Sequence, residues 1–272
     1  MKAVSIIIPW CNREDLAISL LRNSEKFSKN FVEVIIVNGG GSSDLLKKLL
    51  EEVSIENTKY ITLAMPDFNK SLSLNAGVYH SSHDQLFFLD CDVILETELS
   101  SMIQTLKKGS FVTLNKIKET AREHEGKKVG TVEEIAYSIT IRDIKGAEIN
   151  VETNRINLLD SSRSGPGLLL CHKHDFLKVG GMNSELQGWG WEDIDIVYRL
   201  QHLGLVRKRV GNCSHLSHSD KERFLVHESK ALNEQINFKM ALANYMAGNF
   251  LGTYERDVKK LYEEKQDDDK DN

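Results

Sequence analysis

Long apolar runs are absent from this sequence, and so is any start that resembles a secretory signal. The longest apolar runs, such as residues 34–37 and 86–89, fall far short of the roughly 18 residues that a membrane-spanning helix needs. The N-terminus enters a strand-like run at once, without a basic region and a long apolar stretch. We therefore expect a cytoplasmic protein, for which peripheral contact with a membrane stays open.

Paired cysteines and an excess of positive charge are also missing. The cysteines, Cys11, Cys91, Cys171 and Cys213, are widely spaced and form no C-x-x-C pair, so we expect free thiols in a reducing compartment. The net charge is −5, with an isoelectric point near 6.0. This balance argues against a nucleic-acid partner held by phosphate attraction. It still allows a small diphosphate ligand, which needs only local positive charge.

The first half of the chain alternates strand-like and helix-like segments. Short β-branched and apolar runs predict buried strands, and apolar residues at helical spacing predict helices between them. The predicted strands are 4–8, 32–37, 60–63 and 85–89, and the predicted helices are 15–27, 43–52 and 71–80. Strands that alternate with helices every ~25–30 residues imply an α/β fold with a mostly parallel central sheet. Such sheets bind ligands at the carboxyl ends of their strands.

The second half is less regular, and composition guides most of its assignment. The predicted segments are an exposed loop or surface helix at 116–128, a β-hairpin at 139–151 turning near Lys145-Gly146, a mobile loop at 160–167, helices at 221–261 and a disordered acidic tail at 263–272. Charged residues dominate the first of these segments. Serine, glycine and proline dominate the loop, and the tail has almost no apolar residues.

Two aspartates follow the last predicted strand of the first half, in the sequence Asp90-Cys91-Asp92. Residues two apart in an extended segment point to the same side, so we expect the two carboxylates to converge beyond the end of the strand. Two carboxylates there repel each other, and a divalent cation removes that repulsion; oxygen ligands favour Mg²⁺ or Mn²⁺. The alternative is that one aspartate caps the following helix and the other is solvated.

A second unusual segment is Gly-Trp-Gly-Trp-Glu-Asp-Ile-Asp at residues 188–195. Glycines let the backbone approach a ligand closely, and tryptophan offers a flat apolar face to a sugar ring or a base. One of the acidic groups can act as a general base. The alternative is a tight turn followed by a helix with acids in its first turn, which explains the acids but not the Gly-Trp repeat.

Two histidines and one arginine complete the set of candidate residues. His215 and His218 are three residues apart, and either could donate a nitrogen ligand to a cation held by the aspartates. A mixed oxygen and imidazole shell favours Mn²⁺ over Mg²⁺. Arg13 follows the first predicted strand, where the sheet opens to a ligand, and could pair with a phosphate. A structural histidine and a surface arginine are the alternatives.

Taken in order, these stretches resemble the β-1,4-galactosyltransferases and the bacterial enzymes that share their C-terminal catalytic module. Both belong to the wider class of GT-A glycosyltransferases. The matching stretches are 7–13, similar to P-[aromatic]-x-N-R; 68–77, similar to F-N-R-x-x-x-L-N-x-G; 90–92, at the metal-binding D-x-D; 188–195, close to W-G-W-G-x-E-D-x-D; and, more weakly, His218-Ser219, near a metal-binding histidine. The resemblance spans roughly residues 4–220.

The resemblance implies a GT-A fold, with a Rossmann-like nucleotide-binding half and an acceptor-binding half. It implies a metal-dependent, inverting transfer of a hexose or N-acetylhexosamine from a UDP-sugar to a glycan, a lipid-linked acceptor or a peptide. The catalytic domain would be 1–220, divided into a nucleotide-sugar half at 1–115 and an acceptor half at 116–220. A helical extension at 221–262 and the tail at 263–272 would follow.

The resemblance also assigns roles to single residues. Asp92 and His218 would bind Mn²⁺, while Asp90 would contact the donor ribose or the water shell of the metal. Asp193 would deprotonate the acceptor hydroxyl, and Glu192 would bind sugar hydroxyls. The remaining residues of the donor site would be Pro9, Trp10, Arg13, Asn38, Lys70, Asn75 and Trp189.

The sequence departs from the family pattern at three points. Asn38 opens a glycine-rich turn where many GT-A enzymes have paired aspartates, so recognition of uracil by an aspartate is not expected there. Lys70 replaces an arginine, which keeps the charge but loses the planar fork. Trp191 replaces a glycine and would narrow the pocket. Residues 116–160 match nothing in the family and are expected to shape acceptor choice.

Two other functions fit parts of the pattern. A nucleotidyltransferase also uses an α/β sheet and paired carboxylates, but it needs a basic, glycine-rich loop near the N-terminus. The glycine run at 39–41 follows the second strand instead and contains no basic residue. A catalytically inactive UDP-sugar-binding subunit is the other alternative, and turnover of UDP-sugars separates it from an enzyme.

Overall fold

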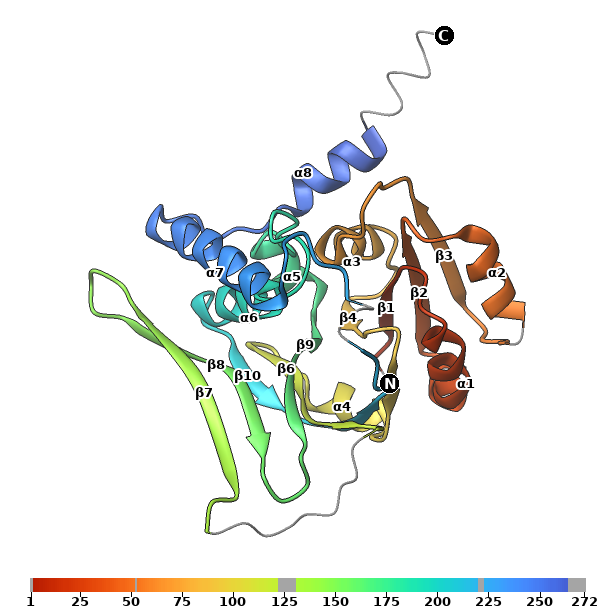
Figure 1. Ribbon diagram of the computed structural model, residues 1–272, viewed down its shortest axis with the longest axis horizontal. Coiled ribbons are helices and arrows are strands. Elements are labelled where there is room, and N and C mark those ends of the chain that lie inside the picture. Colours follow the sequence, from red (N-terminus) through yellow and green to blue (C-terminus); the bar gives the residue numbers. More distant parts are fainter. Residues whose placement is uncertain (1, 52, 122–130, 220–222, 264–272) are drawn as a thin grey trace, which may run out of the picture.

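The computed structural model describes residues 2–51, 53–121, 131–219 and 223–263. Its N-terminal half is a parallel sheet in the order β3-β2-β1-β4 (Figure 1). The strands are β1 (Val4–Trp10), β2 (Val32–Gly39), β3 (Thr58–Leu63) and β4 (Gln85–Phe88), and the helices between them are α1 (Asp15–Phe27), α2 (Ser43–Glu51) and α3 (Lys70–Tyr79). These elements confirm the predicted alternation, and their bounds differ from the expected ones by two residues at most.

Strands β1, β2 and β4 of this parallel sheet are buried on both faces, whereas the edge strand β3 is largely exposed. Ile6 and Ile8 pack in one apolar cluster with α1 and α2, whereas Ile7 packs in a second cluster with α3. Adjacent side chains of a strand point to opposite faces, so a strand covered on both sides needs an unbroken apolar run. That requirement explains why the apolar runs located these strands correctly.

The C-terminal half extends the sheet with strands of both directions. β9 (Arg163–His172) lies between β4 and β6 (Ser110–Glu119) and is antiparallel to both. β11 (Asn212–His215) pairs in parallel with β6, and β5 (Val93–Leu95) is antiparallel to β11. β10 (Val206–Arg209) also pairs in parallel with β6. The class is α/β as expected, but the complete sheet is mixed because β9 reverses its direction.

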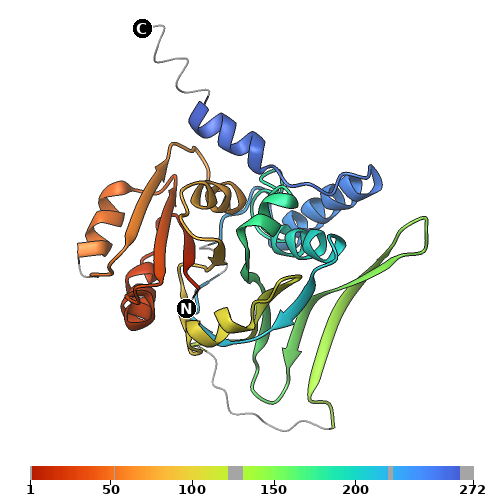
Figure 2. The ribbon, with the colours of Figure 1, turned by 180° about the vertical axis from the view of Figure 1, so that it is seen from behind.

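A long hairpin and several helices surround this half of the sheet. β7 (Glu134–Arg142) and β8 (Glu148–Asn157) form the predicted hairpin, which is longer than expected and projects from the body of the molecule in both views (Figure 1 and Figure 2). The remaining helices are α4 (Leu99–Thr105), α5 (Lys173–Lys178), α6 (Glu192–His202), α7 (Lys230–Met246), α8 (Tyr254–Val258) and the π-helix η2 (Lys259–Glu263). None of the described helices is long and apolar enough to cross a membrane.

Two segments differ from the expectation. Residues 116–119 belong to β6 rather than to a loop or surface helix, while 122–130 lie outside the described residues. The predicted mobile loop at 160–167 is wrong from Arg163 onward, since β9 begins there. Pro166 fits within the strand because the pairing with β6 is irregular at this point, and such bulges tolerate a residue without an N–H.

The C-terminal extension is helical in two parts. Residues 223–229 precede α7 without regular structure, and α8 continues directly into η2. Residues 264–272 of the expected acidic tail lie outside the described residues. All four cysteines are free thiols, as the spacing predicted.

Candidate active site

A cavity of about 680 Å³ opens at the carboxyl ends of β1 and β4. This volume lies within the range of small-molecule sites, and the position is the one expected for a ligand of a parallel sheet. The lining includes nine residues predicted from the sequence: Pro9, Arg13, Lys70, Asp90, Asp92, Trp189, Glu192, Asp193 and His218. Segments far apart in the chain therefore meet around one hollow.

One group in this cavity has the composition of a metal site. Atoms of Asp92, His215 and His218 that could bind a metal all lie within 4.8 Å of one another. Asp92 Oδ1 is 3.4 Å from Nε2 of His215, and Asp92 Oδ2 is 3.4 Å from Nε2 of His218. The sheet creates this proximity, because His215 at the end of β11 pairs with Val93, the neighbour of Asp92.

The two imidazoles are held by their other ring nitrogens. Nδ1 of His215 is 2.8 Å from Oε2 of Glu119, and Nδ1 of His218 is 3.0 Å from the carbonyl oxygen of Ser219. Such partners orient metal-binding histidines in proteins and leave Nε2 for the metal. Burial alone would lower the pKa of His215, but the adjacent Asp92 and Glu119 carboxylates raise it to about 9.

The group fits a divalent cation on one further observation. Oδ1 of Asp92 is buried and has no hydrogen-bond partner among the described residues. Buried acceptors are normally satisfied, so a carboxylate oxygen without a hydrogen bond, 3.4 Å from Nε2 of His215, is consistent with a cation bound at this place. One carboxylate and two imidazoles are ligands that Mn²⁺ accepts.

Asp90 lies apart from this group. Its Oδ1 is 3.0 Å from Nζ of Lys70, at the start of α3. β4 ends at Phe88 and the chain then turns, with the amide of Val93 facing the carbonyl of Asp90 at 3.3 Å, so the extended backbone that was expected at these aspartates is not present. The rule for residues two apart holds only in extended backbone.

Lys70 connects Asp90 to the acidic pair at the start of α6. Its Nζ is 3.4 Å from Oδ1 of Asp193 and 3.8 Å from Oε1 of Glu192. Burial alone would lower the pKa of Lys70, but the carboxylates outweigh it and raise that pKa well above its usual value. Lys70 is therefore a fixed cation between three acids.

The acidic pair of α6 is strongly desolvated. Burial, followed by the charge of Asp193, raises the pKa of Glu192 to about 8 against the opposing charge of Lys70. Burial also raises the pKa of Asp193, although Lys70 opposes it. The carboxylate of Asp193 lies directly against Gly167, where a Cβ atom would overlap it. The observed position of the Asp193 carboxylate therefore requires a residue without a side chain at position 167.

The tryptophan segment is held in an unusual conformation. Trp191 has φ +75°, in the left-handed region that favours glycine, and its ring packs edge-on against Phe238 at 4.5 Å. Its position matches the glycine of the family pattern, so the backbone there keeps the glycine conformation. Trp189 lines the cavity, and Nζ of Lys230 lies 4.1 Å from its ring centroid.

Three predicted donor-site residues are buried away from the cavity. Trp10 donates its indole N–H to the carbonyl of Arg13, and Asn38 exchanges two hydrogen bonds with the backbone of Gly41. Asn75 bonds the backbone of Met182 through both ends of its amide. Each of the three is fully buried, and their side chains hydrogen-bond to the backbone of the loops around the site.

Several residues that line the cavity or support its histidines were not singled out from the sequence. Glu119 belongs to the charged segment that was assigned to a loop, and Gly167 to the segment that was assigned as mobile. Thr153 and Asn154 of β8 also line the cavity. A single sequence offers no signal for them, since their role depends on strands that pair across long separations.

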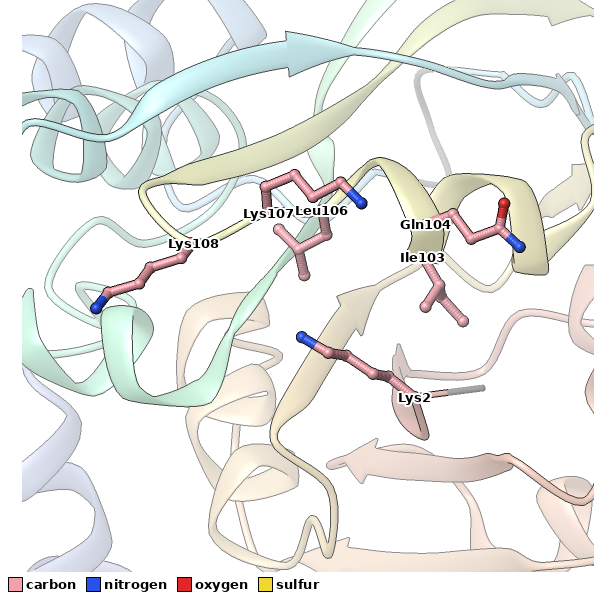
Figure 3. Close-up of a pocket in the computed structure, with 6 residues that line it drawn as sticks. All are labelled: Lys2, Ile103, Gln104, Leu106, Lys107 and Lys108. Atoms are coloured by element: carbon pink, nitrogen blue, oxygen red, sulfur yellow. The ribbon is translucent and has the colours of Figure 1, made fainter.

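A second hollow of about 470 Å³ lies at the opposite, amino-terminal end of β1 (Figure 3). It is lined by Lys2, Ile103, Gln104, Leu106, Lys107 and Lys108. Figure 3 shows the ammonium groups of Lys107 and Lys108 pointing away from each other, so they do not converge on one ligand. The predicted residues are all absent from this hollow.

Comparison with known proteins identifies the family. Residues 5–157 match glycosyl transferase family 2, which covers more than half of the sequence, and the chain belongs to that family. Residues 148–222 match the description "N-terminal domain of galactosyltransferase". The second match contains the Gly-Trp segment and both histidines, which are the stretches that resembled the β-1,4-galactosyltransferases.

Curated relatives share weak but extended similarity. The chain is 24% identical over 257 residues to human chondroitin sulfate N-acetylgalactosaminyltransferase 2, a match that covers 85% of this chain and 44% of the relative. The mouse protein of the same name is 25% identical over 258 residues, with the same coverage. The chain thus spans less than half the length of these relatives.

Solved structures show the fold. GalNAc-T7 with UDP, GalNAc and Mn²⁺ matches with a TM-score of 0.62 and 14% identity, over 89% of this chain and 48% of that chain. The mannosyltransferase PcManGT from Pyrobaculum calidifontis, in complex with GDP-Man and Mn²⁺, matches with a TM-score of 0.53 and 10% identity, over 94% of this chain and 69% of that chain. The expected GT-A fold is confirmed.

Proposed function

We propose that this chain transfers a hexose or N-acetylhexosamine from a UDP-sugar, in a metal-dependent and inverting reaction, to a hydroxyl of a glycan, lipid-linked or peptide acceptor. The observation that supports this function is the single cavity lined by both the Asp92–His215–His218 group and the Glu192–Asp193 pair. Lys70 lines the same cavity and pairs with Asp90 and with Asp193 of the acidic pair. The site therefore combines cation binding with proton chemistry.

The donor would bind on the Asp92 side. Asp92, His215 and His218 would hold the divalent cation, which when bound offsets the charge on the leaving diphosphate. Two imidazole ligands favour Mn²⁺ over Mg²⁺. Nη2 of Arg13 lies 3.2 Å from Oδ2 of Asp92, so its guanidinium would pair with a phosphate oxygen at the same place. Pro9 would line the nucleotide side of the cavity.

Asp193 would carry out the proton transfer. The acceptor hydroxyl oxygen attacks the anomeric carbon, its proton moves to Asp193, and the bond from that carbon to the diphosphate oxygen breaks. One displacement inverts the anomeric configuration. The raised pKa of Asp193 supports this role, because a desolvated carboxylate is a stronger base than an exposed one.

The neighbouring residues would orient the two sugars. With a pKa of about 8, Glu192 is largely protonated at neutral pH and can donate a hydrogen bond to a sugar oxygen. Trp189 would offer a ring face to sugar C–H groups. Thr153 and Asn154 place the β7–β8 hairpin at the rim of the cavity, so that hairpin would shape acceptor choice.

A panel of UDP-hexoses and UDP-N-acetylhexosamines, tested for hydrolysis with Mn²⁺ or with EDTA, examines this function. We expect UDP release from at least one donor and only with the metal. Metal-dependent binding of UDP without turnover of any donor, with or without candidate acceptors, would indicate an inactive binding subunit. Pyrophosphate release from a nucleoside triphosphate and a sugar 1-phosphate would indicate a nucleotidyltransferase.

Glu119→Gln is expected to weaken Mn²⁺ binding by roughly 10–100-fold while the fold is retained, because the variant loses the carboxylate that orients His215. The measurement is Mn²⁺ affinity in the presence of UDP by calorimetry. Glu134→Gln is a matched control, since Glu134 pairs with Arg155 on the hairpin and does not line the cavity. Equal affinities in the two variants would remove Glu119 from the site.

Gly167→Ala is expected to displace the Asp193 carboxylate, since the added Cβ atom would overlap it. Sugar transfer should fall by about 100-fold, which is the typical effect of misplacing a catalytic group by ~1 Å. UDP binding with Mn²⁺ should be unchanged, because Gly167 does not contact the Asp92 group. We would measure the steady-state transfer rate and, by calorimetry, the UDP affinity of the same variant. Transfer at the wild-type rate would contradict the prediction.

A further inference from the structure

Helix α7 lies beyond the segments that match the two families, yet it contacts the centre of the site. It packs beside α6 in both views (Figure 1 and Figure 2), and Tyr245 donates its hydroxyl to Asp195 of α6 at 2.7 Å. Asn233 and Asn237 are one helical turn apart and share one face of α7. Both are buried, at 0% and 3% exposure. Buried side-chain amides need hydrogen-bond partners, so the groups that these two amides bind indicate their role.

Both amides bind the backbone before α6. Nδ2 of Asn237 donates to the carbonyl oxygens of Gln187 and Gly190, at 2.9 and 2.8 Å. Nδ2 of Asn233 donates to the carbonyl oxygens of Gln187 and Trp189, at 2.8 and 2.9 Å. Residues 187–191 are therefore held by four hydrogen bonds from two side chains of α7.

The segment 187–191 has a conformation that needs such support. Gly188, Gly190 and Trp191 have φ values of +73°, +98° and +75°. A tryptophan in the left-handed region costs free energy and persists only when its surroundings hold it. The fit is close, because a Cβ atom on Gly188 would meet the amide of Asn233.

We propose that Asn233 and Asn237 are positioning residues that hold 187–191 in its left-handed conformation. They thereby place Trp189 in the cavity and set the direction in which α6 presents Glu192 and Asp193. The effect on transfer rests on the proposed function, whereas the effect on the tryptophan segment does not. α7 is then a structural part of the catalytic site rather than an extension of the domain.

Asn237→Asp tests this role with little change in shape. The variant replaces two donated hydrogen bonds by a carboxylate that faces two carbonyl oxygens. We expect the two cavity tryptophans to become more accessible to acrylamide quenching, while buried Trp10 stays protected. We expect kcat for transfer to fall by ~10–100-fold, as for other misplaced catalytic groups. Affinity for UDP and Mn²⁺ should stay at the wild-type value.

Gln235→Glu is the matched control, because it makes the same amide-to-acid change at an exposed position of α7. Quenching and kcat in this control should equal those of the wild type. If Asn237→Asp does not fold by thermal unfolding, Asn237→Ala removes the same two donors without adding charge and is measured instead. Wild-type quenching in the folded Asn237 variant would overturn the proposal. If quenching increases in the Asn237 variant but the wild-type chain itself transfers no sugar, the positioning role is supported and the proposed function is contradicted.

Discussion

Asp92→Asn is expected to abolish Mn²⁺-dependent binding of UDP. Asp92 is the only acid in the group of three, and its two oxygens face the Nε2 atoms of His215 and His218. An amide presents one weaker, neutral oxygen and cannot balance the charge of a cation. Because loss of a residue that only orients a ligand typically costs 10–100-fold in metal affinity, loss of the ligand should cost more than about 100-fold. Calorimetric titration of UDP with and without Mn²⁺ measures the effect.

Asp90→Asn is the control that distinguishes the role of Asp92 in metal binding from that of the neighbouring Asp90. Asp90 pairs with Lys70 and lies outside the group of three, so this variant should lose much less metal-dependent UDP affinity than Asp92→Asn. It removes the same charge within two residues of Asp92 and is therefore a stringent control. Unchanged UDP affinity in Asp92→Asn, or an equal loss in both variants, would contradict the assignment of the metal to Asp92 and the two histidines.

Asp193→Asn is expected to keep donor binding and to lose transfer. The amide fits the same space beside Gly167 but cannot accept the proton of the acceptor hydroxyl. Removal of a general base typically lowers the rate by ~10²–10⁴-fold. The comparison of kcat with UDP affinity in the same variant isolates the chemical step. Turnover at the wild-type rate would remove Asp193 as the base.

The pH dependence of the wild-type enzyme tests the same role. Burial, opposed by Lys70, raises the pKa of Asp193. The base must be ionised, so activity is present above this pKa and is lost as the pH falls through it. The acidic limb of kcat/KM should therefore lie above the ordinary aspartate value of about 3.9. Asp193→Asn should lose this limb, and an unchanged limb in that variant would assign it to another group.

The fold was predictable from the sequence where an apolar run in the chain corresponds to a strand that is buried in the structure. Strands β1, β2 and β4 are buried throughout and largely apolar because helices cover both faces, and the sequence shows their apolar runs directly. Residues 116–119 were not predictable as a strand, because Lys116 and Lys118 are charged and only half-buried in β6. The reversed direction of β9 depends on which strands pair, and pairing leaves no mark on a single strand.

The site was predictable in its residue types and less so in its geometry. The ordered motifs located Asp92, His218, Glu192 and Asp193, and the structure brings them to one cavity. The motifs also included Asn75, because the sequence alone does not distinguish an asparagine that binds a ligand from one that supports a loop. Only its bonds to Met182 distinguish the two roles.

The role of α7 was outside the reach of sequence patterns. Asn233 and Asn237 lie more than 40 residues from the carbonyls that they bind, and asparagine at helical spacing has no motif of its own. The helical pattern at 221–261 predicted the element but not its contact with residues 187–191. Long-range hydrogen bonds to backbone carbonyls depend on the complete fold, so only the structure reveals them.

The most direct test of the central claim is the release of UDP from the donor panel by the wild-type chain, titrated with Mn²⁺ and compared with Asp92→Asn and Asp193→Asn. We expect release that saturates with Mn²⁺ in the wild type and is lost in both variants. Of the two variants, only Asp193→Asn should still bind UDP in the presence of Mn²⁺. UDP release that is independent of Mn²⁺, or that persists in Asp92→Asn, would contradict a metal-dependent glycosyltransferase centred on this cavity.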